Sequence, residues 1–140
     1  MVIGRITGGP SPTPGAPPPL TPELGAAGLI VMAAHRDGVS TEVERQEATA
    51  ALMKLLHLPG PKAAALRADA EAAEAAGLGE ATLAAAAAAL SADEREQLVT
   101  CLWSLSRLGP DDAATTVLSA AAAAFDYAPE RMIALRPRRS

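Results

Sequence analysis

The chain has 140 residues, enough for one domain of ordinary size but too few for two independent cores. Hydrophobic residues make up 49% of it, aromatic residues only 2%, and 34 residues are alanine. Alanine favours helices and disfavours strands, so the composition predicts an all-α protein. The formal charge of −4 and the scarcity of aromatic rings argue against a nucleic-acid partner, which calls for basic or base-stacking surfaces.

The composition divides the chain into three parts. Residues 1–20 contain six of the twelve prolines and four of the eleven glycines, a mixture that predicts a disordered leader. Residues 21–136 carry the helical patterns of one domain, and residues 137–140 form a basic tail. The leader lacks the apolar core of a secretory signal, and no apolar stretch approaches the roughly 20 residues that span a bilayer. We therefore expect a cytoplasmic protein without a transmembrane segment.

The first two helices begin with recognisable caps. Thr21 precedes a proline at the first helical position, which predicts a helix that runs to about Arg36. Gly38 breaks this helix. Thr41 and Glu44 have the spacing of a capping box and predict the start of the second helix.

Three more helices follow the same signals. Pro61 predicts the start of a third helix, and Gly77 its end. A short fourth helix is expected over residues 80–90. Ser91 and Glu94 form a second capping box, which predicts the start of a fifth helix.

The last two helices complete an expected set of about seven. Gly109 and Pro110 end the fifth helix, the sixth covers residues 111–125, and a short seventh begins at Pro129. When Gly38 is aligned with Gly109, the two halves of the chain show the same order of elements. Each has an apolar helix, a break at a glycine, a second helix, and then a proline that starts another helix, at Pro61 or Pro129. Either two halves of the domain are weakly related, or the recurrence reflects the ordinary punctuation of helices. The alanine tracts at 84–89 and 120–124 would allow helix axes to approach closely.

No catalytic motif is present, so we expect no enzymatic activity. The single cysteine, Cys101, lies in an apolar run and is expected to be a buried small hydrophobe. Trp103 is expected to be buried against the first helix. His35 and His57 lie near predicted helix ends, where packing accounts for them.

Residues 29–45, LIVMAAHRDGVSTEVER, resemble the first half of the TerB-like family, which is named for tellurite resistance. The shared features are an apolar helix ending in Asp37-Gly38, a short cap, and Glu44-Arg45 on the next helix. The resemblance implies a bundle of about seven helices with two related halves. The family's second Asp-Gly motif is missing, because Leu108 precedes Gly109 and a proline follows it.

The resemblance also implies a possible metal site. Family members with both acidic motifs are associated with divalent-cation binding, a role without catalysis. By position, Asp37 and Glu44 would be ligands for Ca²⁺ or Mg²⁺, and Asp111 and Asp112 could replace the missing half if their loop shifts. The competing interpretation is structural: Asp37 belongs to a helix-to-turn pair, and Glu44 only closes the capping box with Thr41.

The resemblance therefore implies a non-enzymatic accessory domain linked to the tellurite or metal stress response. Such a domain would bind another protein or a small ligand, and a divalent cation weakly. The first alternative is a helical protein–protein adaptor whose cation site has decayed. The second is an enzyme whose site is assembled from residues far apart in the sequence.

Overall fold

The computed structural model describes residues 20–34, 42–106 and 112–136. These residues form seven α-helices and no strand, which confirms the expected all-α TerB-like bundle. The helices are α1 (Pro22–Ala34), α2 (Glu42–Leu56), α3 (Gly60–Ala75), α4 (Glu80–Ala87), α5 (Ala92–Ser106), α6 (Asp112–Phe125) and α7 (Pro129–Ala134). The leader through residue 19 and the tail at 137–140 lie outside the description, so the predicted three-part division stays a prediction. No helix among the described residues is long and apolar enough to cross a membrane.

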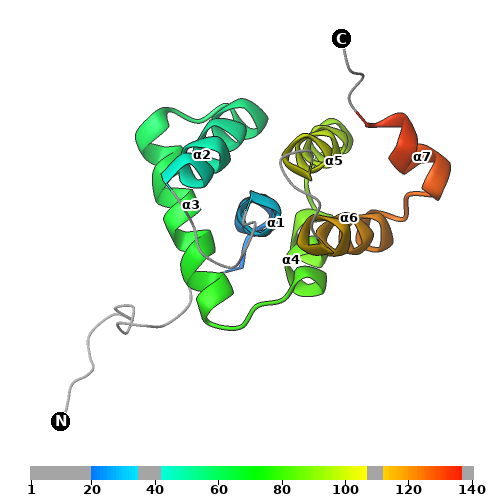
Figure 1. Ribbon diagram of the computed structural model, residues 1–140, viewed down its shortest axis with the longest axis horizontal. Coiled ribbons are helices and arrows are strands. Elements are labelled where there is room, and N and C mark those ends of the chain that lie inside the picture. Colours follow the sequence, from blue (N-terminus) through cyan, green and yellow to red (C-terminus); the bar gives the residue numbers. More distant parts are fainter. Residues whose placement is uncertain (1–19, 35–41, 107–111, 137–140) are drawn as a thin grey trace.

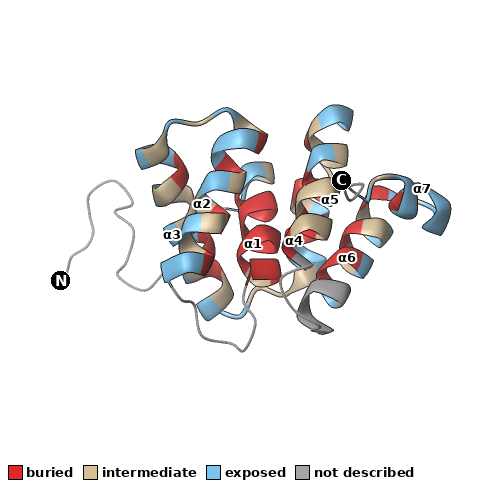
Figure 2. Cartoon of the chain, turned by 45° about the horizontal axis from the view of Figure 1, so that its top comes forward, coloured by how far each residue is buried: buried red, intermediate tan, exposed pale blue. Residues whose placement is uncertain are grey.

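Helix α1 is the centre of the bundle. It contacts α2 and α3 on one side and α4, α5 and α6 on the other (Figure 1). Ten of its thirteen residues are buried, and Figure 2 shows it as an almost continuous buried cylinder. Its apolar run at 26–34 is therefore the core helix of a small domain, which explains why this helix has no polar face.

Helices α1 and α4 cross at unusually short range. A Cβ atom added at Gly25 would collide with the carbonyl oxygen of Leu83 and lie 2.8 Å from the amide nitrogen of Ala87. A Cβ at Gly28 would lie 2.7 Å from the side chain of Leu83. Ala84 and Ala87 are fully buried at this crossing, so the expectation that the first alanine tract permits close approach of helix axes is confirmed.

Two of the predicted helix starts are confirmed by their hydrogen bonds. The backbone N–H of Leu24 donates to Thr21 Oγ1 at 3.0 Å. The backbone N–H of Glu94 donates to Ser91 Oγ at 3.1 Å, and the N–H of Ser91 donates to the Glu94 carboxylate at 3.2 Å. This reciprocal pair is the capping box that the sequence predicts, and it orients the start of α5. Thr41 of the other predicted box lies outside the described residues.

The junction between α2 and α3 closes with a left-handed residue. His57 has a φ of 55°, and the N–H of the next residue, Leu58, donates back to the carbonyl of Met53 at 3.2 Å. Pro59 is extended and is the N-cap of α3. This arrangement is a Schellman ending, in which a residue with positive φ reverses the chain after a helix. His57 therefore lies at a helix end, as expected.

The junction between α6 and α7 repeats this geometry. Asp126 has a φ of 59°, and the N–H of Tyr127 donates to the carbonyl of Ala122 at 3.0 Å. Ala128 is extended with nearly the same angles as Pro59, and α7 follows. The same ending also occurs between α3 and α4, where Gly77 has a φ of 99° and the N–H of Leu78 donates to the carbonyl of Ala73 at 3.1 Å. A geometry found at three junctions is ordinary helix punctuation, so it does not favour two related halves. Placing His57 over Asp126 aligns Gly60 with Pro129. The sequence-based alignment instead places Gly38 over Gly109, and both of these glycines lie outside the described residues.

We expect the substitution Asp126→Gly to raise the free energy of unfolding by about 1 kcal/mol, because the left-handed conformation costs an L-residue roughly that much and costs glycine little. The change also removes a negative charge from the negative end of α6. Urea denaturation followed by circular dichroism measures the effect. Ala123→Gly, at an exposed position inside the same helix, is the matched control and should lower stability instead.

The expected burial of Trp103 against the first helix is wrong. Trp103 is only half-buried, and its indole Nε1–H donates to the carbonyl of Met132 in α7 at 2.9 Å. One turn earlier in α5, the hydroxyl of Thr100 donates to the carbonyl of Leu135 at 3.0 Å. The indole N–H needs a hydrogen-bond acceptor, and the last carbonyls of a helix supply one, whereas the apolar surface of α1 does not.

Candidate functional site

The four predicted metal ligands are only partly described. Asp37 and Asp111 lie outside the described residues, and Asp112 begins α6 with a side chain that is also outside them. Only Glu44 has a described side chain. The convergence of these carboxylates on one ion therefore stays a prediction, and so does the competing structural interpretation.

Glu44 differs from a solvated surface acid. It lies in the first turn of α2 and is only 3% exposed. The positive end of the helix dipole favours a carboxylate at this place, which offsets part of the cost of burying it. Among the described side chains, no group of three or more histidine, cysteine, aspartate or glutamate residues could hold a metal ion.

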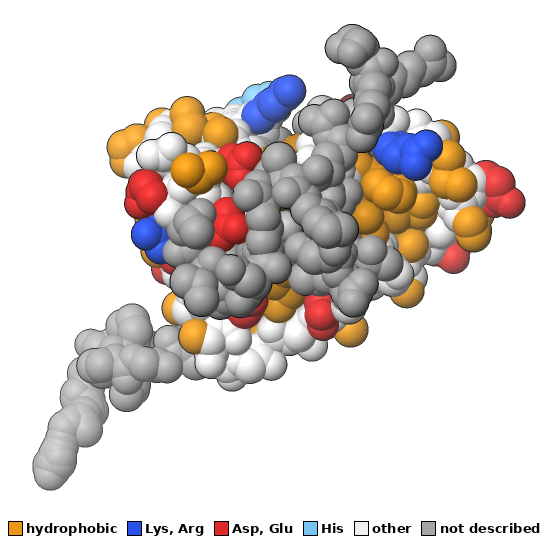
Figure 3. All heavy atoms as spheres, in the orientation of Figure 1, with side chains coloured by type: hydrophobic (Ala, Val, Ile, Leu, Met, Phe, Trp, Pro, Cys, Tyr) orange, Lys and Arg blue, Asp and Glu red, His pale blue; other side chains and the backbone are white. Residues whose placement is uncertain are grey.

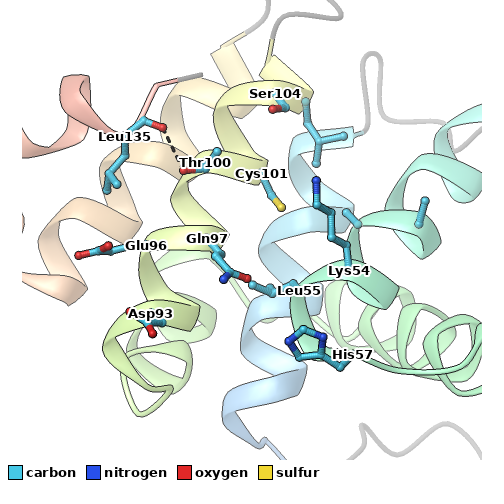
Figure 4. Close-up of a pocket in the computed structure, with 13 residues that line it drawn as sticks. Lys54, Leu55, His57, Asp93, Glu96, Gln97, Thr100, Cys101, Ser104 and Leu135 are labelled. Carbon is cyan, nitrogen blue, oxygen red and sulfur yellow. Dashed lines mark hydrogen bonds between the residues drawn. The ribbon is translucent and has the colours of Figure 1, made fainter. Parts of the chain in front are cut away.

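A groove lies between α2 and α5 (Figure 4). Its volume is about 760 Å³, within the usual range for sites that bind small molecules. The groove is lined by Ala50, Ala51, Lys54, Leu55, His57, Asp93, Glu96, Gln97, Thr100, Cys101, Ser104, Leu105 and Leu135. We call it the α2–α5 groove.

Helix α5 supplies one wall of this groove. Gln97, Thr100, Cys101 and Ser104 recur at intervals of three and four residues, so they project from one face of the helix. The opposite wall comes from the end of α2, where Lys54 extends towards α5 and His57 lies at the rim (Figure 4).

The electrostatics of the groove centre on Lys54 and Cys101. Burial raises the pKa of the Cys101 thiol above its ordinary value, and the positive charge of Lys54 opposes part of this rise. Cys101 is half-buried and lines the groove, so the expectation of a buried cysteine is wrong. At the far end, the carboxylate of Glu96 forms an ion pair with Arg131 of α7.

The raised pKa leads to a testable reactivity. We expect Cys101 in the folded chain to react with N-ethylmaleimide several-fold more slowly near neutral pH than in the urea-unfolded chain, because less of the thiol is thiolate. The rate for the folded chain should keep rising with pH beyond the value at which that for the unfolded chain levels off. Mass spectrometry of quenched samples measures both profiles. Coincident profiles would contradict the shielding of this thiol.

A smaller cavity of about 350 Å³ lies among α5, α6 and α7. Trp103, Leu118, Tyr127 and Ile133 are among its lining residues. Figure 3 shows hydrophobic side chains gathered on this side of the molecule. Its lining is more apolar than that of the α2–α5 groove and has no charged side chain among the described residues, so it offers less for orienting a polar ligand.

The fold and the groove together define a small all-α domain with a cavity between α2 and α5. The family model for tellurite resistance protein TerB matches residues 23–108, and the chain belongs to this family. Helices α6 and α7 lie beyond the matched residues. No curated protein and no solved structure matches the chain.

The sequence-based reasoning missed the α2–α5 groove. One signal was available: the polar side chains of Gln97, Thr100 and Ser104 share a helical face with Cys101. That α2 supplies the opposite wall is a tertiary fact, which no local pattern along the chain contains.

Proposed function

We propose that this protein is a non-enzymatic accessory domain of the TerB family that acts in the tellurite or metal stress response by binding a ligand in the α2–α5 groove. The observation that carries the proposal is the groove itself, a preformed cavity with an apolar floor and a few polar groups on its walls. The ligand is a small molecule or a protein side chain, and the proposed location is the cytoplasm.

Filling the groove tests this function. Ala50 is exposed and lines the cavity, so Ala50→Trp should obstruct the cavity without disturbing the core. Ala65→Trp places the same side chain at an exposed position of α3 that does not line the groove. In a host lacking the gene, we expect the Ala65→Trp variant to restore tellurite tolerance and the Ala50→Trp variant to fail. Equal tolerance with both variants would overturn the role of the groove.

A weak divalent-cation site is a second part of the proposal, supported by the acidic motif at Asp37 and Glu44. Because the family's second motif is missing, few protein oxygens are available and water must complete the coordination sphere. The alternative function is a helical adaptor whose cation site has decayed.

We expect isothermal titration with Ca²⁺ to give a dissociation constant on the order of 10⁻⁴ M or weaker, and Asp37→Ala to abolish the remaining heat. Glu23→Ala, an exposed acid on α1, is the control and should leave the titration unchanged. No heat with the unmodified chain would favour the adaptor. Micromolar binding that survives Asp37→Ala would place a site elsewhere, with Asp111 and Asp112 the next candidates.

A further inference from the structure

We propose that the α2–α5 groove selects small organic anions with an aliphatic body, and that Lys54 contacts the anionic group. This inference rests on the proposed role of the groove in ligand binding and specifies the chemistry of the ligand. It depends on three features of the groove: its aliphatic floor, the positive charge of Lys54, and the way the negative charges of Asp93 and Glu96 are compensated.

The floor of the groove is aliphatic. Ala50, Ala51 and Leu55 of α2 face Leu105 of α5 and Leu135 across the cavity. None of the described lining residues is phenylalanine, tyrosine or tryptophan. Methyl and isobutyl groups provide dispersion contacts and exclude water, but they offer no ring for stacking. A ligand body that is a short alkyl chain or a compact aliphatic group fits this floor.

Lys54 is exposed and lines the groove, so it places a positive charge at the solvent-accessible side of the cavity. Its side chain extends from α2 towards Cys101, and its charge acts on the Cys101 thiol (Figure 4). No ion pair between Lys54 and another described residue is present. Lys54 also lies in the last turn of α2, where the helix dipole favours the charged ammonium. Ser104 adds a hydroxyl donor on the facing wall, and ammonium and hydroxyl donors together suit a carboxylate.

The two acidic residues that line the groove, Asp93 and Glu96, do not cancel its preference for an anion. Glu96 is paired with Arg131, so its charge is already compensated. Asp93 lies in the first turn of α5, where the positive helix end stabilises a carboxylate. Both acids belong to the first half of α5, whereas Ser104 lies in its last turn. The charge of Lys54 acts on Cys101, which with Ser104 belongs to the second half of α5, so the anion is placed on that side of the groove.

Cys101 lets the full-length chain report on occupancy, because it is the single cysteine and lines the groove. The probes are octanoate, octanol and octylamine, which share an alkyl chain and differ in charge. Each is titrated against the rate of Cys101 alkylation by N-ethylmaleimide. We expect octanoate to protect at lower concentration than octanol, and octylamine to protect least.

Lys54→Gln removes the charge, and Lys62→Gln is the matched control, since Lys62 is exposed on α3 and does not line the groove. We expect Lys54→Gln to raise the half-protecting concentration of octanoate about tenfold, the size of one charged contact in a partly solvated site, and to leave octanol unchanged. Lys62→Gln should behave as the unmodified chain. Half-protecting concentrations are compared because Lys54→Gln also alters the basal reactivity of the thiol.

The outcomes separate this inference from the proposed function. Three results would overturn the anion selectivity. The first is an equal half-protecting concentration of octanoate in Lys54→Gln and Lys62→Gln. The others are protection by octylamine at lower concentration than by octanoate, and no protection by any of the three probes. The tolerance assay with Ala50→Trp judges the biological role of the groove independently. Anion protection together with unaltered tolerance would retain the chemistry of the site and reject its proposed role.

Discussion

Replacing Gly25 with alanine is expected to lower the free energy of unfolding by about 3 kcal/mol, the upper part of the usual range for overpacking a core. The added Cβ would collide with the carbonyl oxygen of Leu83 and approach the amide nitrogen of Ala87. These are backbone atoms of α4, so no change of rotamer relieves the clash. Helices α1 and α4 must separate, which loosens their close crossing.

Urea denaturation followed by circular dichroism measures this effect. Gly60→Ala is the control, because a Cβ at Gly60 has no atom within 4 Å and the residue lies at the start of α3. That variant should be more stable by about 0.4–1 kcal/mol, since alanine restricts the unfolded chain. If Gly25→Ala unfolds at the same urea concentration as the unmodified chain, the close crossing of α1 and α4 is wrong.

The helix ends of this protein are predictable because their causes are local. A threonine before Pro22, a serine three residues before Glu94, and a proline at the start of α7 each act on a neighbouring backbone group. Such signals need no knowledge of the rest of the chain. The left-handed residues at His57 and Asp126 were missed because glycine, the usual marker of this conformation, stands only at Gly77 among the described positive-φ positions.

The tertiary features were not predictable in the same way. Nothing local to Gly25 indicates that α4 crosses there, and nothing local to Lys54 indicates that Cys101 lies opposite. The burial of Glu44 has the same origin: a glutamate near a helix start is usually solvated, and its burial depends on tertiary packing that the local sequence does not contain. The candidate site was predicted from one acidic motif, whereas the described cavity lies between helices that the motif does not connect.

Helix α7 shows how a short element is fixed by a few specific contacts. It has six residues and buries only Met132, so hydrophobic burial alone holds it weakly. Three side chains of α5 bind it: Thr100 and Trp103 donate to its last carbonyls, and Glu96 pairs with Arg131. Because Leu135 lines the α2–α5 groove, the position of α7 also shapes that cavity. Of these contacts, the indole of Trp103 combines the largest surface with a hydrogen bond.

Trp103→Ala should therefore lower the free energy of unfolding by about 3 kcal/mol, the lower end of the usual range for removing a large aromatic side chain, because this one is half-buried. Trp103→Phe keeps an aromatic ring but loses the N–H that donates to Met132, so it should lower the free energy of unfolding by about 1 kcal/mol.

Urea denaturation gives both values, and faster tryptic cleavage after Arg131 would report the release of α7. Ile133→Ala is the control, since Ile133 is 59% exposed on the same helix and its loss should change little. Because the indole donates to α7, the alanine variant should retain the buried packing of α1; a collapse of the whole bundle's helicity in the absence of urea would contradict this assignment.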